Sequence, residues 1–394
     1  MNIDHVYFYV NDAIAARDWF VQKLGFQAVG SGHDCDRVIE VVNAGSIYFV
    51  LGSARHATSA VTHFLQHHPP GVSNIAFCVD DIEITITAAV RQGAILIEPI
   101  QTEWQAQGRL KWATIAALGD LRHTIFERVG TTSLLPQSTT SGLSQVLVSP
   151  AVSSSSSPTS QRTAKTRHRS RPNADLTGID HVVLNVAKGD LAASVAWYER
   201  VLGFHPQQGF EIQTNYSGLC SRVLRHPQSG IQLPINEPAS ENSQIQEFLD
   251  LNRGPGVQHI ALETDDLIGA IAQFRHNGLS LLHVPPIYYT QLRQRPGLPL
   301  SEAVLQQVEQ QQILVDWQDA VQPAVLLQTF TQPIFNEPTF FFELIQRQFS
   351  RSDNPVGRAQ GFGEGNFRAL FEAIEREQMK RGSLQVPLAQ ETAD

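Results

Sequence analysis

The stretch GVSNIAFCVDD at residues 71–81 returns about half a chain later as GVQHIALETDD at residues 256–266. Such an internal repeat determines the architecture, because each copy must fold as the same kind of unit. The main chemical difference between the copies is that Asn74 in the first is His259 in the second. A position that holds a metal-binding residue type in one copy and an amide in the other indicates which copy is functional.

The repeat extends in both directions from these stretches. The motif IDHV occurs at residues 3–6 and 179–182, and the motif LGF closes a helix-like segment at residues 24–26 and 202–204. The segment HTIFE at 123–127 resembles TFFFE at 339–343. Each half of the chain is therefore expected to carry the same elements in the same order.

Composition limits the classes of protein that this chain can be. Its 394 residues suffice for two domains, and 42% hydrophobic with 17% charged residues is typical of a soluble globular protein. No apolar run approaches the roughly 20 residues that span a bilayer. The chain enters an apolar alternating segment at residues 6–10, which leaves no room for a signal peptide, so we expect a cytoplasmic protein. A formal net charge of -9 argues against nucleic acid as a partner.

The three cysteines, Cys35, Cys78 and Cys220, are widely spaced. They lack the paired spacing of a zinc site and the even count of a disulfide framework. We expect all three to be reduced and buried, as small hydrophobic residues.

The amino-acid composition changes between the two halves. A serine run at 153–157 precedes a basic run at 162–171 that has almost no large apolar residues. We read the basic run as a solvated linker rather than a nucleic-acid patch, since it lacks interleaved aromatic residues. The predicted organisation is an N-terminal domain at 1–130, a linker at 131–176 and a C-terminal domain at 177–394.

Periodicity alternates between strand and helix within each half. Residues 181–186 are β-branched and bounded by polar residues, as in a strand, and apolar residues then recur at helical spacing from Leu191 to Leu202. The predicted fold class is α+β, with two domains of paired strand-helix-strand modules that form curved mixed sheets. A helix at about 366–381 follows the glycine-rich residues 361–366, which favours a hinged lid.

His181, His259 and Glu343 are the candidate metal ligands of the second half. Each lies on an apolar segment, and a carboxylate inside FFFELI at 340–345 needs a cation or strong hydrogen bonds. Two imidazoles and one carboxylate form the facial triad of non-haem Fe(II) oxygenases. The plainer alternatives are core histidines, and an ion pair of Glu343 with Arg347.

The first half offers His5, Asn74 and Glu127 at the corresponding positions. Carboxamide oxygen is a poor ligand for Fe(II) compared with imidazole. We therefore expect the N-terminal domain to lack a metal site.

The second half resembles the 4-hydroxyphenylpyruvate dioxygenases, a family of the vicinal-oxygen-chelate superfamily. The matching motifs, in chain order, are GIDHVV at 178–183, LPINEP at 233–238, SQIQE at 243–247, GVQHIAL at 256–262, ILVD at 313–316, LQTFT at 327–331, FELIQR at 342–347 and GFGEGNF at 361–367. The first half resembles the family only through the shared module.

The resemblance implies two vicinal-oxygen-chelate-type domains and one Fe(II) per chain, held by His181, His259 and Glu343. It also implies a reaction in which 4-hydroxyphenylpyruvate and O₂ become homogentisate and CO₂. The polar residues that it places near the substrate are Ser221, Asn236, Gln244, Gln258 and, close to the metal-bound end, Gln328. The remaining substrate-pocket residues that it implies are Pro234, Phe330, Phe341, Phe367 and, on the closing helix, Asn366.

Three alternatives accompany this reading. A 4-hydroxymandelate synthase would use the same substrate, but the motif at 234–236 favours ring hydroxylation. An extradiol dioxygenase shares the triad, but the motif at 361–367 is not its hallmark. A metal-free binding module would have lost its ligands in both halves. Homogentisate would serve either tyrosine breakdown or prenylquinone synthesis. The resemblance also implies a homodimer or homotetramer, the usual oligomeric states of the family.

Overall fold

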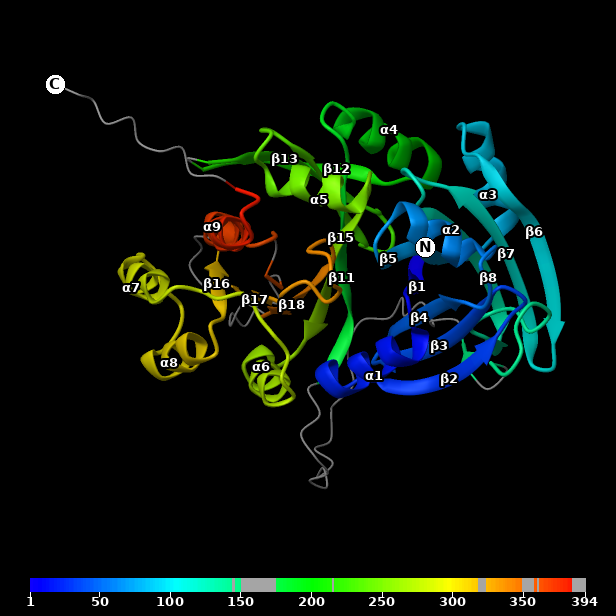
Figure 1. The fold of residues 1–394 in the computed structure, drawn as a ribbon, viewed down its shortest axis with the longest axis horizontal. Coiled ribbons are helices and arrows are strands. Elements are labelled where there is room, and N and C mark those ends of the chain that lie inside the picture. The colour runs from blue at the N-terminus through cyan, green and yellow to red at the C-terminus, as the bar shows by residue number, and fades with distance from the viewer. Residues whose placement is uncertain are drawn as a thin grey trace.

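The computed structural model describes residues 1–143, 146–149, 175–214, 216–317, 324–348, 358–359 and 361–384. Each half contains an eight-stranded mixed sheet, and the two sheets have the same strand order, β2-β3-β4-β1-β5-β8-β7-β6 and β12-β13-β14-β11-β15-β18-β17-β16. The halves lie side by side (Figure 1), with the first in blue to cyan and the second in green to red. The predicted pair of curved mixed sheets is confirmed.

The elements of the first half are β1 (Asn2–Tyr9), α1 (Ala13–Leu24), β2 (Gln27–His33), β3 (Arg37–Ala44), β4 (Ile47–Ala54), α2 (Ala60–His67), β5 (Gly71–Val79), α3 (Ile82–Arg91), β6 (Leu96–Gln105), β7 (Gly108–Ala116) and β8 (Arg122–Gly130). The connecting segment contains β9 (Thr132–Ser133) and β10 (Leu147–Val148). Those of the second half are β11 (Leu176–Asn185), α4 (Leu191–Leu202), β12 (His205–Gln213), β13 (Gly218–Arg225), β14 (Gln232–Pro238), α5 (Gln244–Asn252), β15 (Gly256–Thr264), α6 (Leu267–His276), α7 (Pro286–Gln294), α8 (Glu302–Gln310), β16 (Leu314–Trp317), β17 (Val325–Phe330), β18 (Phe341–Arg347) and α9 (Glu364–Arg381).

The Asp-Asp pair that closes each repeated stretch has a structural explanation. Its second member caps the helix that follows: Asp81 accepts a hydrogen bond from the backbone N–H of Ile84, and Asp266 accepts one from that of Gly269. An aspartate at this position satisfies one of the free N–H groups at a helix start and opposes the positive end of the helix dipole. The repeat therefore encodes a strand, a cap and a helix in one short stretch.

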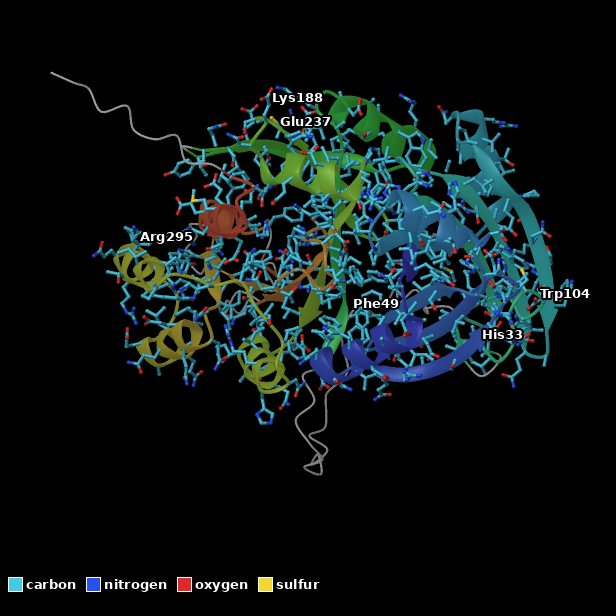
Figure 2. The ribbon with its side chains drawn as sticks, viewed as in Figure 1. His33, Phe49, Trp104, Lys188, Glu237 and Arg295 are labelled. Carbon is cyan, nitrogen blue, oxygen red and sulfur yellow. The ribbon has the colours of Figure 1, made fainter. Side chains whose placement is uncertain are left out.

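An aromatic core joins the halves along β18. The rings of Phe340 and Phe342 face the first half: Phe340 packs edge-on against Phe8 at 5.2 Å, and Phe342 stacks on Phe49 at 5.8 Å. Phe49, labelled in Figure 2, lies where the two sheets meet. Alternate residues of a strand point to opposite faces, so Phe341 and Glu343 of the same strand point away from this core. The first half thus supports the strand that carries the candidate carboxylate.

Residues 131–149 do not form the start of a linker. Strands β9 and β10 pair with each other, and the apolar side chains of this segment enter a core with the inner face of the first sheet. The segment contributes Leu134, Leu135, Leu143 and Val146 to this core. The predicted domain boundary at 130 is therefore too early. Residues 150–174, including the serine and basic runs, lie outside the described residues.

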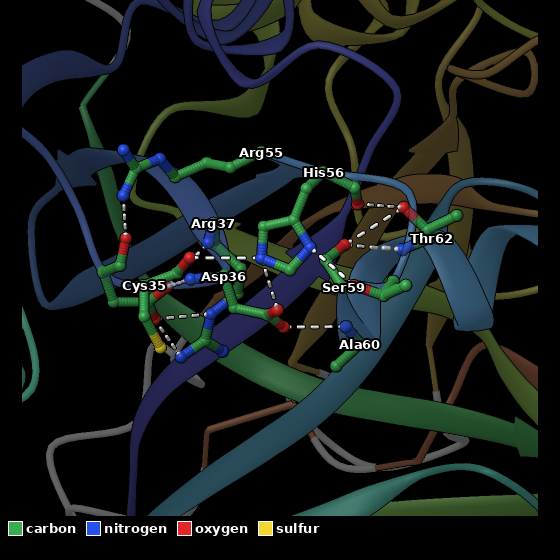
Figure 3. A network of polar contacts seen from close by, with 10 residues as sticks. Cys35, Asp36, Arg37, Arg55, His56, Ser59, Ala60 and Thr62 are labelled. Carbon is green, nitrogen blue, oxygen red and sulfur yellow. Dashed lines mark hydrogen bonds and ion pairs between the residues drawn. The ribbon is translucent and has the colours of Figure 1, made fainter.

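A polar network ties the β2–β3 turn to the start of α2 (Figure 3). Asp36 accepts a hydrogen bond of 2.7 Å from the backbone N–H of Ala60 and lies 3.3 Å from the His56 ring. Cys35 belongs to this turn and is exposed, whereas Cys78 and Cys220 are half-buried. All three cysteines are unpaired, as expected, but the prediction that all would be buried is wrong: Cys35 lies in an exposed turn, and Cys78 and Cys220 lie on the interior strands β5 and β13 with their side chains half-buried.

Among the described residues, no helix combines the length and the apolar composition needed to cross a membrane. Two helices, α7 and α8, lie between α6 and β16, whereas α3 of the first half is followed directly by β6. Helix α9 begins at Glu364, two residues before the predicted start, and ends at Arg381 as predicted. It lies against β16 and α5.

Candidate metal centre and pocket

The three predicted ligands meet inside the second sheet. They come from three neighbouring strands, His181 from β11, His259 from β15 and Glu343 from β18, and all are buried. The Oε2 atom of Glu343 lies 3.2 Å from Nε2 of His181 and 3.6 Å from Nε2 of His259. Ligand atoms that share one ion at about 2.1 Å, at right angles, are separated by about 3 Å. The donor set and its spacing therefore fit a metal ion with open positions on one side.

The orientation of each imidazole is fixed from behind. Nδ1 of His181 bonds Asp180 at 2.8 Å, and Nδ1 of His259 bonds the Gln258 side chain at 3.1 Å. Both Nε2 atoms are thereby left for the metal, and such outer partners raise the basicity of histidine ligands. Arg347 forms a bidentate ion pair with Asp180, at 2.6 and 2.8 Å. Arg347 was the alternative ion-pair partner of Glu343, but it pairs with Asp180 instead.

The charges of the site favour a cation. Burial opposes a charged His181, but the charge of Glu343 and hydrogen bonds to Asp180 and Glu343 raise the pKa of His181 to about 9. Burial likewise opposes ionisation of Glu343, and His181 nevertheless holds the Glu343 pKa below its usual value. Burial lowers the pKa of His259. Without a metal ion, a proton on His181 compensates the buried carboxylate, and a divalent cation would replace that proton.

A small cavity of about 70 Å³ adjoins the three ligands. Eight of the predicted pocket residues line it, namely Ser221, Pro234, Asn236, Gln244, Gln258, Gln328, Phe330 and Phe341. Phe341 stacks on the His259 ring at 4.7 Å. The sequence motifs thus correspond to one continuous wall around the ligands.

The wall of the cavity carries polar atoms without partners. Among the described residues, Ser221 Oγ and Gln244 Oε1 are buried with no hydrogen bond. Asn236 Nδ2 donates to Asn185 Oδ1 at 3.3 Å, and Asn185 is fully buried. Leaving a buried polar atom unpaired costs about 1–3 kcal/mol, so these atoms of the wall suit a ligand with a polar group.

Asn366 does not line the cavity but touches a residue that does. Its Nδ2 donates to Gln328 Oε1 at 3.1 Å, and Gln328 Nε2 donates to Glu343 Oε1 at 3.3 Å. The side chain of Phe367 lies outside the described residues, so its predicted contact with the substrate stays a prediction. Residues of α9 close the cavity, since Phe371 and Ile374 belong to its wall.

Several wall residues were not predicted. Phe362 packs edge-on against His181 at 5.1 Å, and the apolar wall also includes Val183, Phe210, Ile212 and Leu219. Phe362 stands between two glycines with positive φ, Gly361 and Gly363, and this pattern is the one signal in the sequence that could have marked it. The other residues read as ordinary core positions, because an apolar pocket wall and an apolar core share the same strand pattern.

Strand register shows what occupies the metal positions in the first half. In the second half, Ala261 of β15 pairs with Glu343 of β18. In the first half, Ala76 corresponds to Ala261, and the residue after it, Phe77, pairs with Ile125 of β8. The counterpart of Glu343 is therefore Thr124, and the predicted correspondence with Glu127 is wrong by three residues. Glu127 instead accepts hydrogen bonds from Ile82 N and Arg109.

The first half has closed its site. Asn74 Nδ2 donates to Thr124 Oγ1 at 2.7 Å, so the two replaced ligands satisfy each other. Tyr7, the counterpart of Val183 by its pairing with Asn74, projects into the space that the cavity occupies in the second half, and Gly52 makes room for its ring. The apolar side chains of Leu134, Leu135, Leu143 and Val146 pack in the same core as Tyr7. The first half does bring Asp81, Glu83 and Glu127 together, but two of these carboxylates are exposed and none occupies a position of the triad.

Comparisons with known proteins agree with this architecture. The model of the Glyoxalase/Bleomycin resistance protein/Dioxygenase superfamily matches residues 2–110 and 178–295, one match in each half. The solved structure of a variant of 4-hydroxymandelate synthase from Streptomyces coelicolor superposes with a TM-score of 0.75 at 24% identity, over 96% of this chain and 98% of that one. At that identity the likeness concerns the fold alone.

Curated relatives are similar over nearly the whole chain. A 4-hydroxyphenylpyruvate dioxygenase from Dictyostelium discoideum is 36% identical, over 97% of this chain and 99% of the relative. Proteins of the same name from Coccidioides posadasii and Danio rerio are each 34% identical, over 97% and 99% of this chain and 94% of each relative. Taken with the repeated fold and the triad in its second half, these similarities show that the chain belongs to the 4-hydroxyphenylpyruvate dioxygenase family of the Glyoxalase/Bleomycin resistance protein/Dioxygenase superfamily.

Proposed function

We propose that this chain is an Fe(II)-dependent dioxygenase that converts 4-hydroxyphenylpyruvate and O₂ to homogentisate and CO₂. The observation that carries the proposal is the buried triad of His181, His259 and Glu343 beside a cavity whose wall holds unpartnered polar atoms. When bound, Fe(II) would supply the binding of the 2-oxo acid and the activation of dioxygen.

The pocket residues match the two ends of this substrate. The carboxylate and keto oxygens belong at the triad, beside Gln328, and the phenol hydroxyl belongs at Ser221 and Gln244. Phe330 and Phe341 offer ring faces and edges between the two ends, which suits an aromatic ring. The protein's own contribution is to orient the ring and to exclude water from the reacting centre.

The pocket is small for the substrate, and we propose that α9 moves to admit it. A cavity of about 70 Å³ holds a few water molecules, whereas small-molecule sites usually measure about 300 Å³ or more. The wall that can give way is α9, which contributes Phe371 and Ile374 and is linked to α5 by an ion pair of 2.9 Å between Arg381 and Glu247. We therefore include a lid function for α9 in the proposal.

The decisive experiment measures bound iron per chain, oxygen uptake on addition of 4-hydroxyphenylpyruvate, and the aromatic product. We expect one Fe(II) per chain and homogentisate as product; hydroxymandelate would instead identify a synthase. His259→Asn reproduces Asn74 of the first half and should abolish turnover. It should weaken Fe(II) binding by more than about 10- to 100-fold, because that is the usual cost of changing only a residue that contacts a metal ligand. Normal iron content and turnover in that variant would overturn the proposal. Light scattering of the same protein tests the expected dimer or tetramer.

A further inference from the structure

A line of hydrogen-bonded side chains runs from helix α7 to the carboxylate of the metal centre. The Tyr288 hydroxyl lies 2.8 Å from Asn366 Oδ1, Asn366 Nδ2 lies 3.1 Å from Gln328 Oε1, and Gln328 Nε2 lies 3.3 Å from Glu343 Oε1. The chain thus joins three elements, α7, α9 and β17, to the ligand on β18. None of its links uses the oxygen of Glu343 that faces the two imidazoles.

The tyrosine end favours one direction for each bond. The backbone N–H of Val315 donates to the Tyr288 oxygen at 2.8 Å, and the single hydroxyl proton then has two acceptors in reach, Asn366 Oδ1 at 2.8 Å and the Val315 carbonyl at 3.2 Å, of which Asn366 is the nearer. Burial raises the pKa of Tyr288 well above its ordinary value, so the hydroxyl keeps this proton at any physiological pH. An amide that accepts on its oxygen must donate from its nitrogen on the other side. Asn366 therefore donates to Gln328, and Gln328 donates to Glu343.

We propose that Tyr288 is a positioning residue of the metal centre, which fixes the amide orientations of Asn366 and Gln328 and so keeps an N–H group on Glu343 Oε1. This inference rests on the proposed function, since it takes Glu343 to be a metal ligand. Gln328 Nε2 also donates to the Phe362 carbonyl at 3.4 Å, so the hydroxyl strengthens an orientation that this longer bond already favours. Without the hydroxyl the preference is weaker, and a turned Gln328 amide would place its oxygen against the carboxylate oxygen and be repelled by it. With the Tyr288 hydroxyl in place, Glu343 Oε2 stays directed at His181 and His259.

The surrounding backbone is shaped to allow this chain. A Cβ atom at Gly363, whose φ is +78°, would lie 1.7 Å from Gln328 Oε1, so only glycine leaves room for that amide. The backbone N–H of Gly365 donates to Asp316 Oδ2 at 3.0 Å, and Arg295 holds the other oxygen of Asp316 at 3.0 Å. The first turn of α9 is thereby seated where Asn366 reaches both Tyr288 and Gln328.

The first half has no counterpart of the hydrogen-bonded side chains that lead from Tyr288 to Glu343. By strand register, Thr124 stands for Glu343 and Trp112 stands for Gln328, since Trp112 pairs with Phe126 as Gln328 pairs with Ile345. No helix of the first half corresponds to α7 among its described residues. The half without a metal position therefore also lacks the residues that would orient a carboxylate ligand.

The test compares Tyr288→Phe with Tyr289→Phe in the full chain. Tyr289 is the matched control, because it is the neighbouring tyrosine of α7 and its hydroxyl donates to Ile313 O at 3.1 Å, outside the hydrogen-bonded line to Glu343. Tyr289 is buried, whereas Tyr288 is half-buried, so a general packing effect should be at least as large in the control. Each protein is stripped of metal and titrated anaerobically with ferrous ion, and its melting temperature is measured. We expect Tyr288→Phe to weaken Fe(II) binding about tenfold, the lower end of the effect of outer-shell partners, and Tyr289→Phe to change it by less than about twofold.

A double-variant comparison separates orientation from general loosening. Gln328→Met removes the amide that Tyr288 orients, so Tyr288→Phe should have no further effect on Fe(II) affinity in that background. Unchanged affinity in Tyr288→Phe, an equal loss in Tyr289→Phe, or independent losses in the double variant would each overturn the inference. If Tyr288→Phe cannot be purified, Asn366→Ala cuts the same chain and carries the same expectation. Absence of Fe(II) binding in the wild-type chain would instead refute the proposed function.

Discussion

The Tyr198 hydroxyl of helix α4 donates a hydrogen bond of 2.9 Å to Nε2 of His123 on β8, and so joins the two halves of the chain inside their shared core. Nδ1 of His123 donates to the Ile75 carbonyl at 3.1 Å, which fixes the tautomer that leaves Nε2 as an acceptor. The imidazole is fully buried, and burial favours its neutral form.

Acid should therefore destabilise the junction of the halves. Burial lowers the pKa of His123 from 6.5 to about 4. Because the unfolded chain binds this proton more tightly, the contribution of His123 to stability is full above pH 6.5 and is lost as the pH falls toward 4, by on the order of 3 kcal/mol. Urea unfolding between pH 7 and pH 4.5 measures the loss. His123→Gln, which can make both bonds without titrating, should show a shallower dependence, and an identical slope would contradict the assignment.

Removing the Phe49 ring should destabilise the protein by about 3–5 kcal/mol, the usual cost of a large cavity in a core. Phe49 is fully buried and stacks on Phe342, the neighbour of Glu343, so Phe49→Ala should also lower Fe(II) affinity. Denaturant unfolding and metal titration check the two effects. Trp104→Ala is the control, because Trp104 is 76% exposed and its loss should change stability by less than about 0.5 kcal/mol. A mild effect of Phe49→Ala would show that the halves are not coupled through β18.

Substrate discrimination should depend on the two unpartnered polar atoms of the pocket. Ser221→Ala and Gln244→Met remove Oγ and Oε1 respectively, and each should lower kcat/KM for 4-hydroxyphenylpyruvate by about 10- to 100-fold while changing that for phenylpyruvate far less. The reason is that phenylpyruvate lacks the hydroxyl that these atoms would bind. Parallel losses for both substrates would mean that the two side chains support the pocket wall rather than recognise the phenol.

Gly363→Ala should impair the metal centre beyond its cost in stability. The added Cβ would have to displace the Gln328 amide, and a non-glycine residue at φ +78° costs about 1–2 kcal/mol. Gly203→Ala carries the same backbone strain, with φ +70°, but its Cβ would meet nothing within 4 Å. Both variants should lose similar stability in thermal unfolding, and only Gly363→Ala should lose Fe(II) affinity and turnover. Equal activity in the two would show that Gln328 tolerates displacement.

The sequence by itself determined the two-copy architecture and predicted the candidate ligand set. The repeated stretch with its capping Asp81 and Asp266 encodes a strand and the following helix through local interactions, and the exchange of Asn74 for His259 identifies the half that keeps its site. Alternation along a strand likewise places Glu343 and Phe341 on one face. These features depend on residues close together in the sequence, so they can be predicted from a single sequence.

Only the tertiary structure decided how the copies differ. Hydrogen-bond register between β5 and β8, which no spacing reveals, makes Thr124 and not Glu127 the counterpart of Glu343. Whether an apolar segment packs against a sheet or leaves the domain depends on the space available, so the sequence predicts a linker at 131–176, whereas Leu134, Leu135, Leu143 and Val146 belong to a core. The chain from Tyr288 to Glu343 joins residues 55 positions apart in sequence, and contacts of that range arise only when the packed elements bring them together.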